Sequence, residues 1–514
     1  MERTSVIIIG GSLVGLSASL FLAWRGVPHI LVEKHSGSSP HPRAIGFTET
    51  SLEHFRAAGI ADHIPQVPAD MRLRRVKAAS LTGERLEETY WTPEKWPNRS
   101  AVDLSPCTGA AIAQDKLEPI LREAARDRGA DMRLGVEMVS FAQDDSGVSV
   151  RLRPRDGALE YEIAADYMIA ASGADSTIRE MLGITRSGVG HLRTLRSVLF
   201  RCPAADAALA SGFQQYEIEQ PDLRAFLTTY GDSRWVLIFD DDRERSEAEL
   251  RTAVLRALGR EMEFEIITTG RWEMAGRISD RYSLGRIFLA GDVAHQLPPT
   301  RGGFGANTGI DDVWNLAWKL QWVLAGTSMP HLLDTYDAER RPIGWLRHQQ
   351  TFSRPDYAKW VDATFEPDRL FGDDAMEFGQ LVRSSAVIGA GDDLPAAASP
   401  TVWAGQPGTR APHAWIGRGG ETISTLDLFG KDFILMTEDQ AWLAAIGGLP
   451  IKGYLVGFDI VFPEGGAFET RFGICGKGAT LIRPDGIVAW RTDKSADVGE
   501  LRRVIAQVVS ERAR

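Results

Sequence analysis

The chain has 514 residues, 44% of them hydrophobic and 25% charged, a composition typical of globular proteins and unlike a disordered tail, a coiled coil or a collagen. The length predicts about three domains at roughly 150 residues each, enough to bury a large core without disulfides or metals. The net charge of −11 argues against general nucleic-acid binding. Three widely spaced cysteines, Cys107, Cys202 and Cys475, form no disulfide framework or zinc spacing and indicate a reducing cytoplasm.

The chain begins with a predicted strand, turn, helix and second strand. Residues 5–9 are a β-branched run, and Leu13, Leu16, Leu20 and Trp24 recur at helical spacing. Residues 29–33 form the second strand. The uncharged stretch 5–24 approaches the length of a membrane span, but glycines and serines interrupt it, so we interpret it as a βαβ unit and expect no membrane partner.

A glycine-rich loop, Gly10-Gly-Ser-Leu-Val-Gly15, joins this strand to this helix. A dinucleotide pyrophosphate needs such a loop, because glycines permit a tight turn and the helix N-terminus faces the phosphates. A carboxylate at the end of the second strand can bind ribose hydroxyls. The residues predicted to bind the cofactor here are Gly10, Ser12, Leu13, Val14, Gly15, Glu33 and Lys34. Ser12 replaces the usual middle glycine, and a tight turn without a ligand is the alternative.

The middle of the chain mixes helices and strands. We predict helices at 50–59 and 116–128 and strands at 148–152 and 167–170. From 190 to 275 the pattern becomes sheet-rich, with strands at 198–202, 225–230 and 235–240. A strand at 286–290 and a helix from about 310 to 325 follow. The small-residue, proline-containing stretch 389–400 is a plausible linker.

The stretch from 286 to 320 carries the longest motif, which includes Gly291-Asp292, Pro298-Pro-Thr-Arg301, Gly302-Gly303-Phe-Gly305 and Ala306-Asn307. A strand delivers Asp292, whose carboxylate can accept a hydrogen bond from a hydroxyl. The prolines and glycines let backbone approach a flat ring, and the following helix N-terminus can stabilise negative charge on that ring. No histidine pair has metal spacing, so we predict no metal. His295 is expected to pack or to form hydrogen bonds rather than act as a base.

This motif resembles the "GD" segment of the FAD-dependent aromatic hydroxylases typified by p-hydroxybenzoate hydroxylase. Three further pieces match the family in order: His41-Pro-Arg43-Ala44, Gln114 before a helix, and residues 333–342. The resemblance implies that the FAD-binding residues also include Arg43, Gln114, Gly291, Asp292, Pro299, Gly302, Gly303, Gly305, Ala306 and Asn307. It also implies a catalytic loop with Pro298, Arg301 and Gly303.

One segment departs from the family pattern. Family members carry an aspartate where Ser172 stands in Ala170-Ala-Ser172-Gly173-Ala-Asp175, in a motif linked to flavin and nicotinamide nucleotide. The departure leaves the fold and FAD binding in place and bears on reduction by NAD(P)H. Arg301 is a second departure, because it adds a residue to the turn of the simplest members.

Residues 400–514 resemble the thioredoxin-like appendage of the larger hydroxylases that act on phenols and polycyclic aromatic polyketides. Cys475 is alone there, so we expect a structural unit or an oligomer surface, which leaves a homodimer open. The predicted fold is mixed α/β: a Rossmann-like FAD-binding domain at 1–185 and 277–390, a sheet-rich substrate domain at 186–276, and a thioredoxin-like domain at 400–514.

The resemblance implies a cytoplasmic monooxygenase. FAD, reduced by a transient NADPH or NADH, reacts with O₂ to give a C4a-hydroperoxide that hydroxylates an aromatic, polycyclic substrate. Alternatives are Baeyer–Villiger or epoxidising chemistry, or a flavin-binding protein that has lost turnover. Strand alternation places Phe226 and Thr228 on one face, and we expect an apolar pocket there, although half of the nearby aromatics are ordinary core. The predicted substrate residues are Phe213, Phe226, Thr228 and Trp235.

Overall fold

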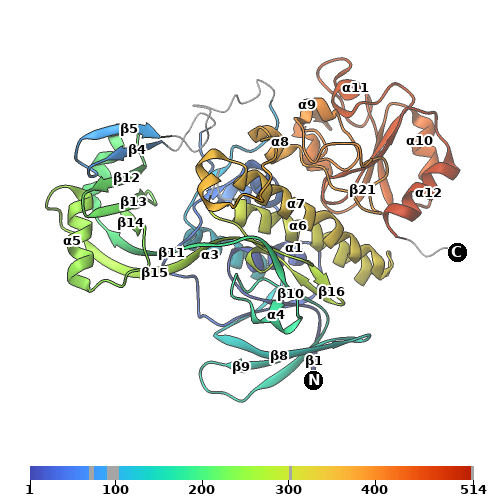
Figure 1. The fold of residues 1–514 in the computed structure, drawn as a ribbon. Coiled ribbons are helices and arrows are strands. Elements are labelled where there is room, and N and C mark those ends of the chain that lie inside the picture. The colour runs from blue at the N-terminus through green and yellow to red at the C-terminus, as the bar shows by residue number, and fades with distance from the viewer. Residues whose placement is uncertain (69–73, 90–102, 300–303, 511–514) are drawn as a thin grey trace.

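The computed structural model describes residues 1–68, 74–89, 103–299 and 304–510. Figure 1 shows a first sheet low in the view, a second sheet on the left and the C-terminal unit on the right, with α6 and α7 running through the centre. The predicted mixed α/β fold class is confirmed.

The first sheet has the order β16-β17-β10-β1-β2-β7, and β10 also pairs with the hairpin of β9 and β8. Strands β17, β10, β1, β2 and β7 are mutually parallel. Residues 6–8 of β1 are fully buried, as expected for a parallel strand covered on both faces. The strands are β1 (Glu2–Ile9), β2 (His29–Glu33), β7 (Asp131–Leu134), β8 (Val136–Asp144), β9 (Gly147–Pro154), β10 (Tyr161–Ala170), β16 (Ser283–Leu284) and β17 (Ile287–Leu289).

Helices cover this sheet and carry the loops of the candidate site. Helix α1 packs against both α3 and α6. The sequence predicted the α6 helix from residue 310, because glycine, asparagine and threonine form helices poorly. In the structure this helix spans Phe304–Leu324. Close packing explains the glycine at position 309, because a Cβ there would lie 2.6 Å from Val14 and 3.0 Å from the Gly291 Cα. The helices are α1 (Leu13–Trp24), α2 (Glu49–Ala57), α3 (Gln114–Arg126), α4 (Thr177–Met181), α6 (Phe304–Leu324), α7 (Asp334–Phe352), α8 (Asp373–Phe378) and α9 (Pro400–Trp403), with the short pair β3 (Gly46–Phe47) and β6 (Ala110–Ala111).

The second sheet has the order β18-β15-β11-β14-β13-β12-β4-β5. One face packs on α5 (Glu247–Leu258), which begins at a capping box of Ser246 and Glu249. Strands β4 and β5 come from the stretch assigned by sequence to the FAD-binding domain, yet they pair into this sheet. The strands are β4 (Arg75–Ala78), β5 (Arg85–Thr89), β11 (Arg186–Arg201), β12 (Gln215–Gln220), β13 (Leu223–Thr229), β14 (Arg234–Phe239), β15 (Glu265–Ser279) and β18 (His295–Gln296).

The C-terminal unit is built on a four-stranded sheet of order β22-β21-β23-β24, in which only the β21–β22 pair is parallel. Its core is continuous with Trp318 and Trp322 of α6, so this unit packs directly on the central helix. Cys475 is exposed and free. The elements are β19 (Trp415–Arg418), β20 (Glu421–Ser424), β21 (Phe433–Thr437), β22 (Ile451–Leu455), β23 (Ala479–Ile482), β24 (Val488–Thr492), α10 (Gln440–Ala445), α11 (Ala467–Phe472) and α12 (Val498–Val508).

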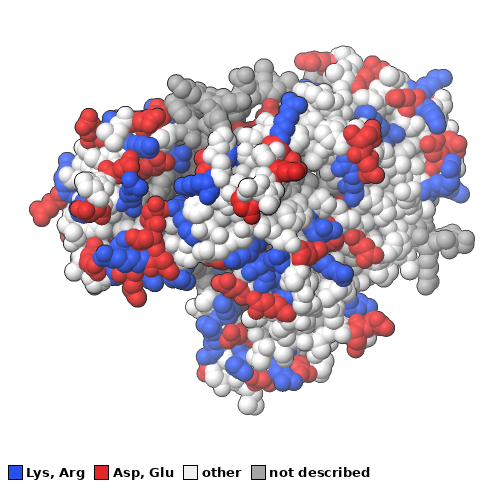
Figure 2. Space-filling model, viewed as in Figure 1, with Lys and Arg blue, Asp and Glu red and all other residues white. Residues whose placement is uncertain are grey.

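Short 3₁₀ segments complete the described chain: η1 (Ala61–His63), η2 (Pro203–Ser211), η3 (Gly291–Val293), η4 (Pro330–Leu333), η5 (Pro355–Trp360) and η6 (Thr425–Leu428). None of the helices in these ranges combines the length and apolar character that a membrane span requires. On the face drawn in Figure 2, acidic and basic side chains are interspersed.

Candidate active site

The loop between β1 and α1 is built so closely that only glycine fits at its two ends. A Cβ at Gly10, whose φ is +111°, would lie 2.4 Å from the Ala171 carbonyl oxygen, and one at Gly15 would lie 1.8 Å from the Gly10 oxygen. Ser12, the N-cap residue, makes no side-chain bond to the first amides of α1. These amides, which begin at Leu13 and Val14, therefore remain for an anion, as a pyrophosphate requires.

Glu33 closes this loop from the end of β2. Its Oε2 accepts a hydrogen bond of 2.6 Å from the Gly11 amide, and its Oε1 accepts one of 2.8 Å from the His35 amide. The carboxylate is only partly buried, so it is still accessible to a ribose. Lys34, the next residue, is exposed.

Gln114 ties the loop to the segment around Arg43. Its Nε2 donates to Ser12 Oγ (2.8 Å) and to Glu118 Oε1 (2.7 Å), and Ser12 Oγ also donates to Glu118 (2.7 Å). The backbone N–H of Gln114 donates to the Ala44 carbonyl at 2.9 Å. Glu118, which is 2% exposed, is a positioning residue that the sequence reasoning missed. Arg43 itself is exposed.

The second predicted motif forms a left-handed turn after β17. Gly291 has a φ of +64°, and its amide donates to Asp312 Oδ2 at 3.2 Å. Asp312 Oδ2 also lies 2.7 Å from His295 Nε2, while Arg340 Nε donates to Asp312 Oδ1 at 2.8 Å. Burial would raise the pKa of Asp312, but His295 and Arg340 outweigh it and lower that pKa. Asp312 and Arg340 were missed from sequence, although two adjacent aspartates in an apolar helix were a usable signal.

Asp292 follows this turn with its carboxylate half-buried. Within the described ranges it has no hydrogen-bond or ion-pair partner. Because a partly desolvated carboxylate gains from a donor, it suits a hydroxyl of the kind found on a ribityl chain. The crowded Gly10–Gly15 loop and this carboxylate together fit FAD.

The start of α6 faces the same region. Asn307 is buried and holds the segment before α2 and the first turn of α2. Its Oδ1 accepts from the Thr48 amide (3.1 Å) and Ser51 Oγ (2.7 Å), and its Nδ2 donates to the Gly46 carbonyl (3.3 Å). The predicted residues Gly305 and Ala306 lie in the first turn of α6.

The proline corner precedes α6. Pro298 is buried and Pro299 is exposed, and the Pro299 carbonyl accepts a 3.1 Å bond from Tyr357 of η5, another residue that the sequence reasoning missed. The predicted residues Arg301, Gly302 and Gly303 lie outside the described residues.

The four predicted substrate residues do not share one face. Phe226 and Thr228 are half-buried and point away from α5, as strand alternation predicted. Trp235 and Phe213 belong to the core cluster on the α5 side, where Trp235 is fully buried and donates to Asp206 at 2.9 Å. The structure thus brings two of the four together. The site role of each residue stays a prediction.

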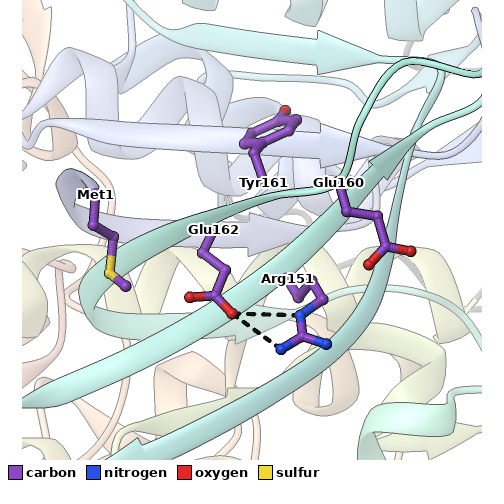
Figure 3. Close-up of a pocket in the computed structure, with 5 residues that line it drawn as sticks. All are labelled: Met1, Arg151, Glu160, Tyr161 and Glu162. Carbon is purple, nitrogen blue, oxygen red and sulfur yellow. Dashed lines mark hydrogen bonds and ion pairs between the residues drawn. The ribbon is translucent and has the colours of Figure 1, made fainter.

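We also searched the described residues for a metal site and for surface hollows. No group of three or more His, Cys, Asp or Glu side chains is arranged to hold a metal ion there. Figure 3 shows a surface hollow lined by Met1, Arg151, Glu160, Tyr161 and Glu162, in which Arg151 pairs with Glu162 at 3.2 Å. None of the predicted site residues lines it.

The fold and the site define a dinucleotide-binding protein suited to a flavin, and comparison with known proteins gives the family. A family model described as an FAD binding domain matches residues 3–351, and one described as an aromatic-ring hydroxylase C-terminal domain matches residues 404–511. The aklavinone 12-hydroxylase of Streptomyces purpurascens is 36% identical, over 98% of this chain and 99% of the relative. The tetracenomycin A2 monooxygenase-dioxygenase of Streptomyces glaucescens is 35% identical, over 99% and 97%.

Solved structures agree with this result. The complex of aklavinone-11 hydroxylase with FAD and aklavinone is 34% identical and superposes with a TM-score of 0.86, over 99% of each chain. The flavin-dependent monooxygenase PieE, in complex with FAD and substrate, gives a TM-score of 0.85 at 28% identity. The chain therefore belongs to the FAD-dependent aromatic-ring hydroxylases, and it is a flavin-dependent monooxygenase.

Proposed function

We propose that the protein hydroxylates a polycyclic aromatic polyketide, with O₂ as the oxygen source and NADPH or NADH as the transient reductant. The observation that carries the proposal is the end-to-end likeness to a hydroxylase whose structure holds FAD and aklavinone. The half-buried Phe226 and Thr228 support it, because they offer apolar surface on the sheet face turned away from α5.

The residues of the chain bind and orient the reactants. FAD, when bound and reduced, would activate O₂, and O₂ would supply the oxygen atom. The amides at the start of α1 would hold the pyrophosphate, Glu33 would bind the ribose, and Asp292 would accept a hydrogen bond from the ribityl chain. The N-terminus of α6 would stabilise negative charge on the flavin.

The test is substrate-stimulated oxidation of NADPH by the FAD-loaded enzyme. Tetracyclic phenolic polyketides should stimulate it, and small charged benzoates should not, because Phe226 offers apolar surface on which a fused ring system can pack. The opposite pattern would refute the substrate class. Heavy-isotope O₂ and the product mass identify the chemistry: one labelled oxygen in a new ring hydroxyl is expected, whereas label in an ester or epoxide would indicate the Baeyer–Villiger or epoxidising alternative.

A flavin-binding protein without turnover is distinguished by the flavin absorbance. An active enzyme loses the oxidised flavin band on anaerobic addition of NADPH with substrate, and regains it with O₂. A protein that keeps the band under these conditions would have lost turnover.

A further inference from the structure

Two segments of the FAD-binding region, residues 44–53 and 105–114, run together and form what we call the paired ribbon. In its middle, β3 of the first segment pairs with β6 of the second. The two segments approach closely, since a Cβ at Gly109 would lie 2.9 Å from the Phe47 carbonyl oxygen. Because the segments are hydrogen-bonded and in contact, a displacement of one should displace the other.

One end of the paired ribbon contacts two residues that are predicted to bind FAD. Asn307 of α6 accepts from the Thr48 amide and donates to the Gly46 carbonyl. At the same end, the backbone N–H of Gln114 donates to the Ala44 carbonyl. A displacement of the paired ribbon should therefore disturb both predicted FAD residues.

An arginine of the C-terminal unit holds the other end of the paired ribbon. Arg410 makes a bidentate contact with Glu53 of α2, in which its Nε donates to Oε2 at 2.8 Å and its Nη2 donates to Oε1. The same Nη2 donates to the Leu104 carbonyl at 3.0 Å, and Ser105 Oγ donates to Glu53 Oε1 at 2.6 Å. One guanidinium thus ties both segments of the ribbon to the C-terminal unit.

Helix α2 has a second ion pair with the C-terminal unit, and the two pairs differ in exposure. Arg56 donates to Asp427 at 2.8 Å, and the Arg56 side chain is 37% exposed. The side chains of Arg410 and Glu53 are only 15% and 7% exposed. Exposed ion pairs contribute little, whereas a largely buried bidentate pair is strong and directional. Arg410 is therefore the contact that can keep the paired ribbon in one position.

We propose that Arg410 is a positioning residue for FAD binding, through which the C-terminal unit holds the paired ribbon where Asn307 and Gln114 require it. The inference rests on the FAD roles expected of these two residues and is independent of the substrate class. Without Arg410, the Glu53 carboxylate loses its bidentate partner and the ribbon occupies its seated position for less of the time. The apparent affinity for FAD falls in proportion to the seated fraction.

The test measures FAD release from the loaded enzyme on dilution, followed by flavin fluorescence. Arg410→Met keeps an aliphatic side chain and removes the bidentate contact. It should raise the Kd for FAD at least about tenfold, as expected when the seated fraction falls to about a tenth. Arg56→Met is the matched control, because it breaks the exposed ion pair of the same helix, and its Kd should stay within about twofold of the wild type. Equal Kd values for the two variants would overturn the proposal.

A double-mutant cycle separates positioning from a general loss of stability. If Arg410 acts through the ribbon on Asn307, the two substitutions share a route and their effects should not add. Arg410→Met introduced into Asn307→Ala should then raise the Kd for FAD by about threefold or less, instead of about tenfold. Losses of FAD affinity that add in full would show that Arg410 does not act through this contact, and would overturn the proposal.

Hydrogen exchange tests the ribbon directly, even if Arg410→Met is poorly folded. The double variant Glu53→Leu/Arg410→Met removes both charges, so it leaves no buried carboxylate without a partner. Amides of residues 44–53 and 105–114 in the loaded enzyme should exchange at least about tenfold faster in this variant than in the wild type or in Arg56→Met, with β1 unchanged. Unchanged exchange in the ribbon would overturn the role of Arg410. None of these measurements needs a substrate, so such a failure would leave the proposed hydroxylation standing.

Discussion

Helices α6 and α7 hold two buried charge clusters that differ in what they support. The first is Asp312 with Arg340 and His295, in which Asp312 accepts a hydrogen bond from the Gly291 amide, next to Asp292. The second is Glu339 and Lys319 with Arg483 and Asp485 of the C-terminal unit. The first cluster shapes the FAD side of the molecule, and the second joins the C-terminal unit to the central helices.

The second cluster has two acidic and two basic side chains, and their buried polar atoms form hydrogen bonds. Glu339 accepts from Arg483 at 2.6 and 2.9 Å and from Lys319 at 2.9 Å, and all three side chains have no exposed surface. Burial would raise the pKa of Glu339, but Arg483 and Lys319 lower it well below its usual range. Outside this cluster, Arg410 pairs with Glu53 of α2 at 2.8 Å. The C-terminal unit is therefore fastened to two parts of the FAD-binding region.

The largest expected effect is at the junction. Arg483→Met removes one cation and leaves Glu339 and Asp485 buried with only Lys319, which should lower the free energy of unfolding by about 3–5 kcal/mol. Urea unfolding followed by tryptophan fluorescence measures it. The FAD affinity of the folded enzyme should stay within about twofold, because distant sites act independently.

Arg151→Met is the matched control, since Arg151 and Glu162 form an exposed pair. It should change the unfolding free energy by at most about 1 kcal/mol. An Arg483→Met protein as stable as this control would show that the junction cluster contributes nothing to stability.

A substitution in the first cluster should lower FAD affinity, unlike Arg483→Met in the second. Asp312→Asn removes a negative charge beside Arg340 and weakens the hydrogen bond from the Gly291 amide. FAD affinity should therefore fall by at least about tenfold, and the free energy of unfolding should fall by about 3 kcal/mol. Flavin fluorescence titration of the apoprotein measures the affinity. If Asp312→Asn and Arg483→Met had the same effect on FAD affinity, the distinction between the two clusters would be wrong.

Of the residues expected to touch FAD, Asp292 should separate FAD affinity from stability, whereas Glu33 should affect both. In Asp292→Ala and Glu33→Ala the loss of a charge-assisted hydrogen bond to FAD is worth roughly 1.5–3 kcal/mol, or about ten- to hundredfold in FAD affinity. Glu33→Ala also removes the bonds from the Gly11 and His35 amides, so it should lower stability as well. The apoprotein of Asp292→Ala should unfold like the wild type, because Asp292 has no partner among the described residues. The purified wild type should be yellow, with flavin released by acid or heat; flavin retained after denaturation would contradict noncovalent binding.

The sequence could indicate candidate site residues only where they lie close together in the chain. Gly10, Gly15 and Glu33 lie within one βαβ unit and were predicted from local spacing, and Asp292 and Asn307 lie within one segment and were predicted from its resemblance to a family motif. Glu118 reaches Ser12 across 106 residues, and Ser197 reaches His41 across 156, so no local pattern indicates either contact. The pairing of β4 with β12 is non-local in the same way. Trp235 shows a second limit, because residue type alone did not tell a substrate-facing aromatic from a core one.

The smallest expected effect concerns Ser172, which lies beside the glycine-rich loop. Its Oγ is 2.9 Å from Ser176 Oγ, and a Cβ at Gly10 would lie 2.9 Å from its backbone nitrogen. Ser172 is exposed, so an aspartate fits there and can accept a hydrogen bond from Ser176. If the family aspartate helps to seat the nicotinamide nucleotide, Ser172→Asp should leave FAD reduction by NAD(P)H unchanged or make it faster. The reaction of chemically reduced enzyme with O₂ should not change.

The competing interpretation gives the role to Asp175 through a shifted turn. Asp175 is exposed, and Arg186 holds the turn by donating to the Ala174 carbonyl at 3.3 Å. On this interpretation Asp175→Ala should slow reduction more than about tenfold, a loss above about 1.4 kcal/mol in transition-state stabilisation. Anaerobic stopped-flow measurement of both variants decides between the two. A Ser172→Asp enzyme that keeps its FAD but is no longer reduced would refute the first interpretation, because the added carboxylate would then obstruct the nucleotide rather than seat it.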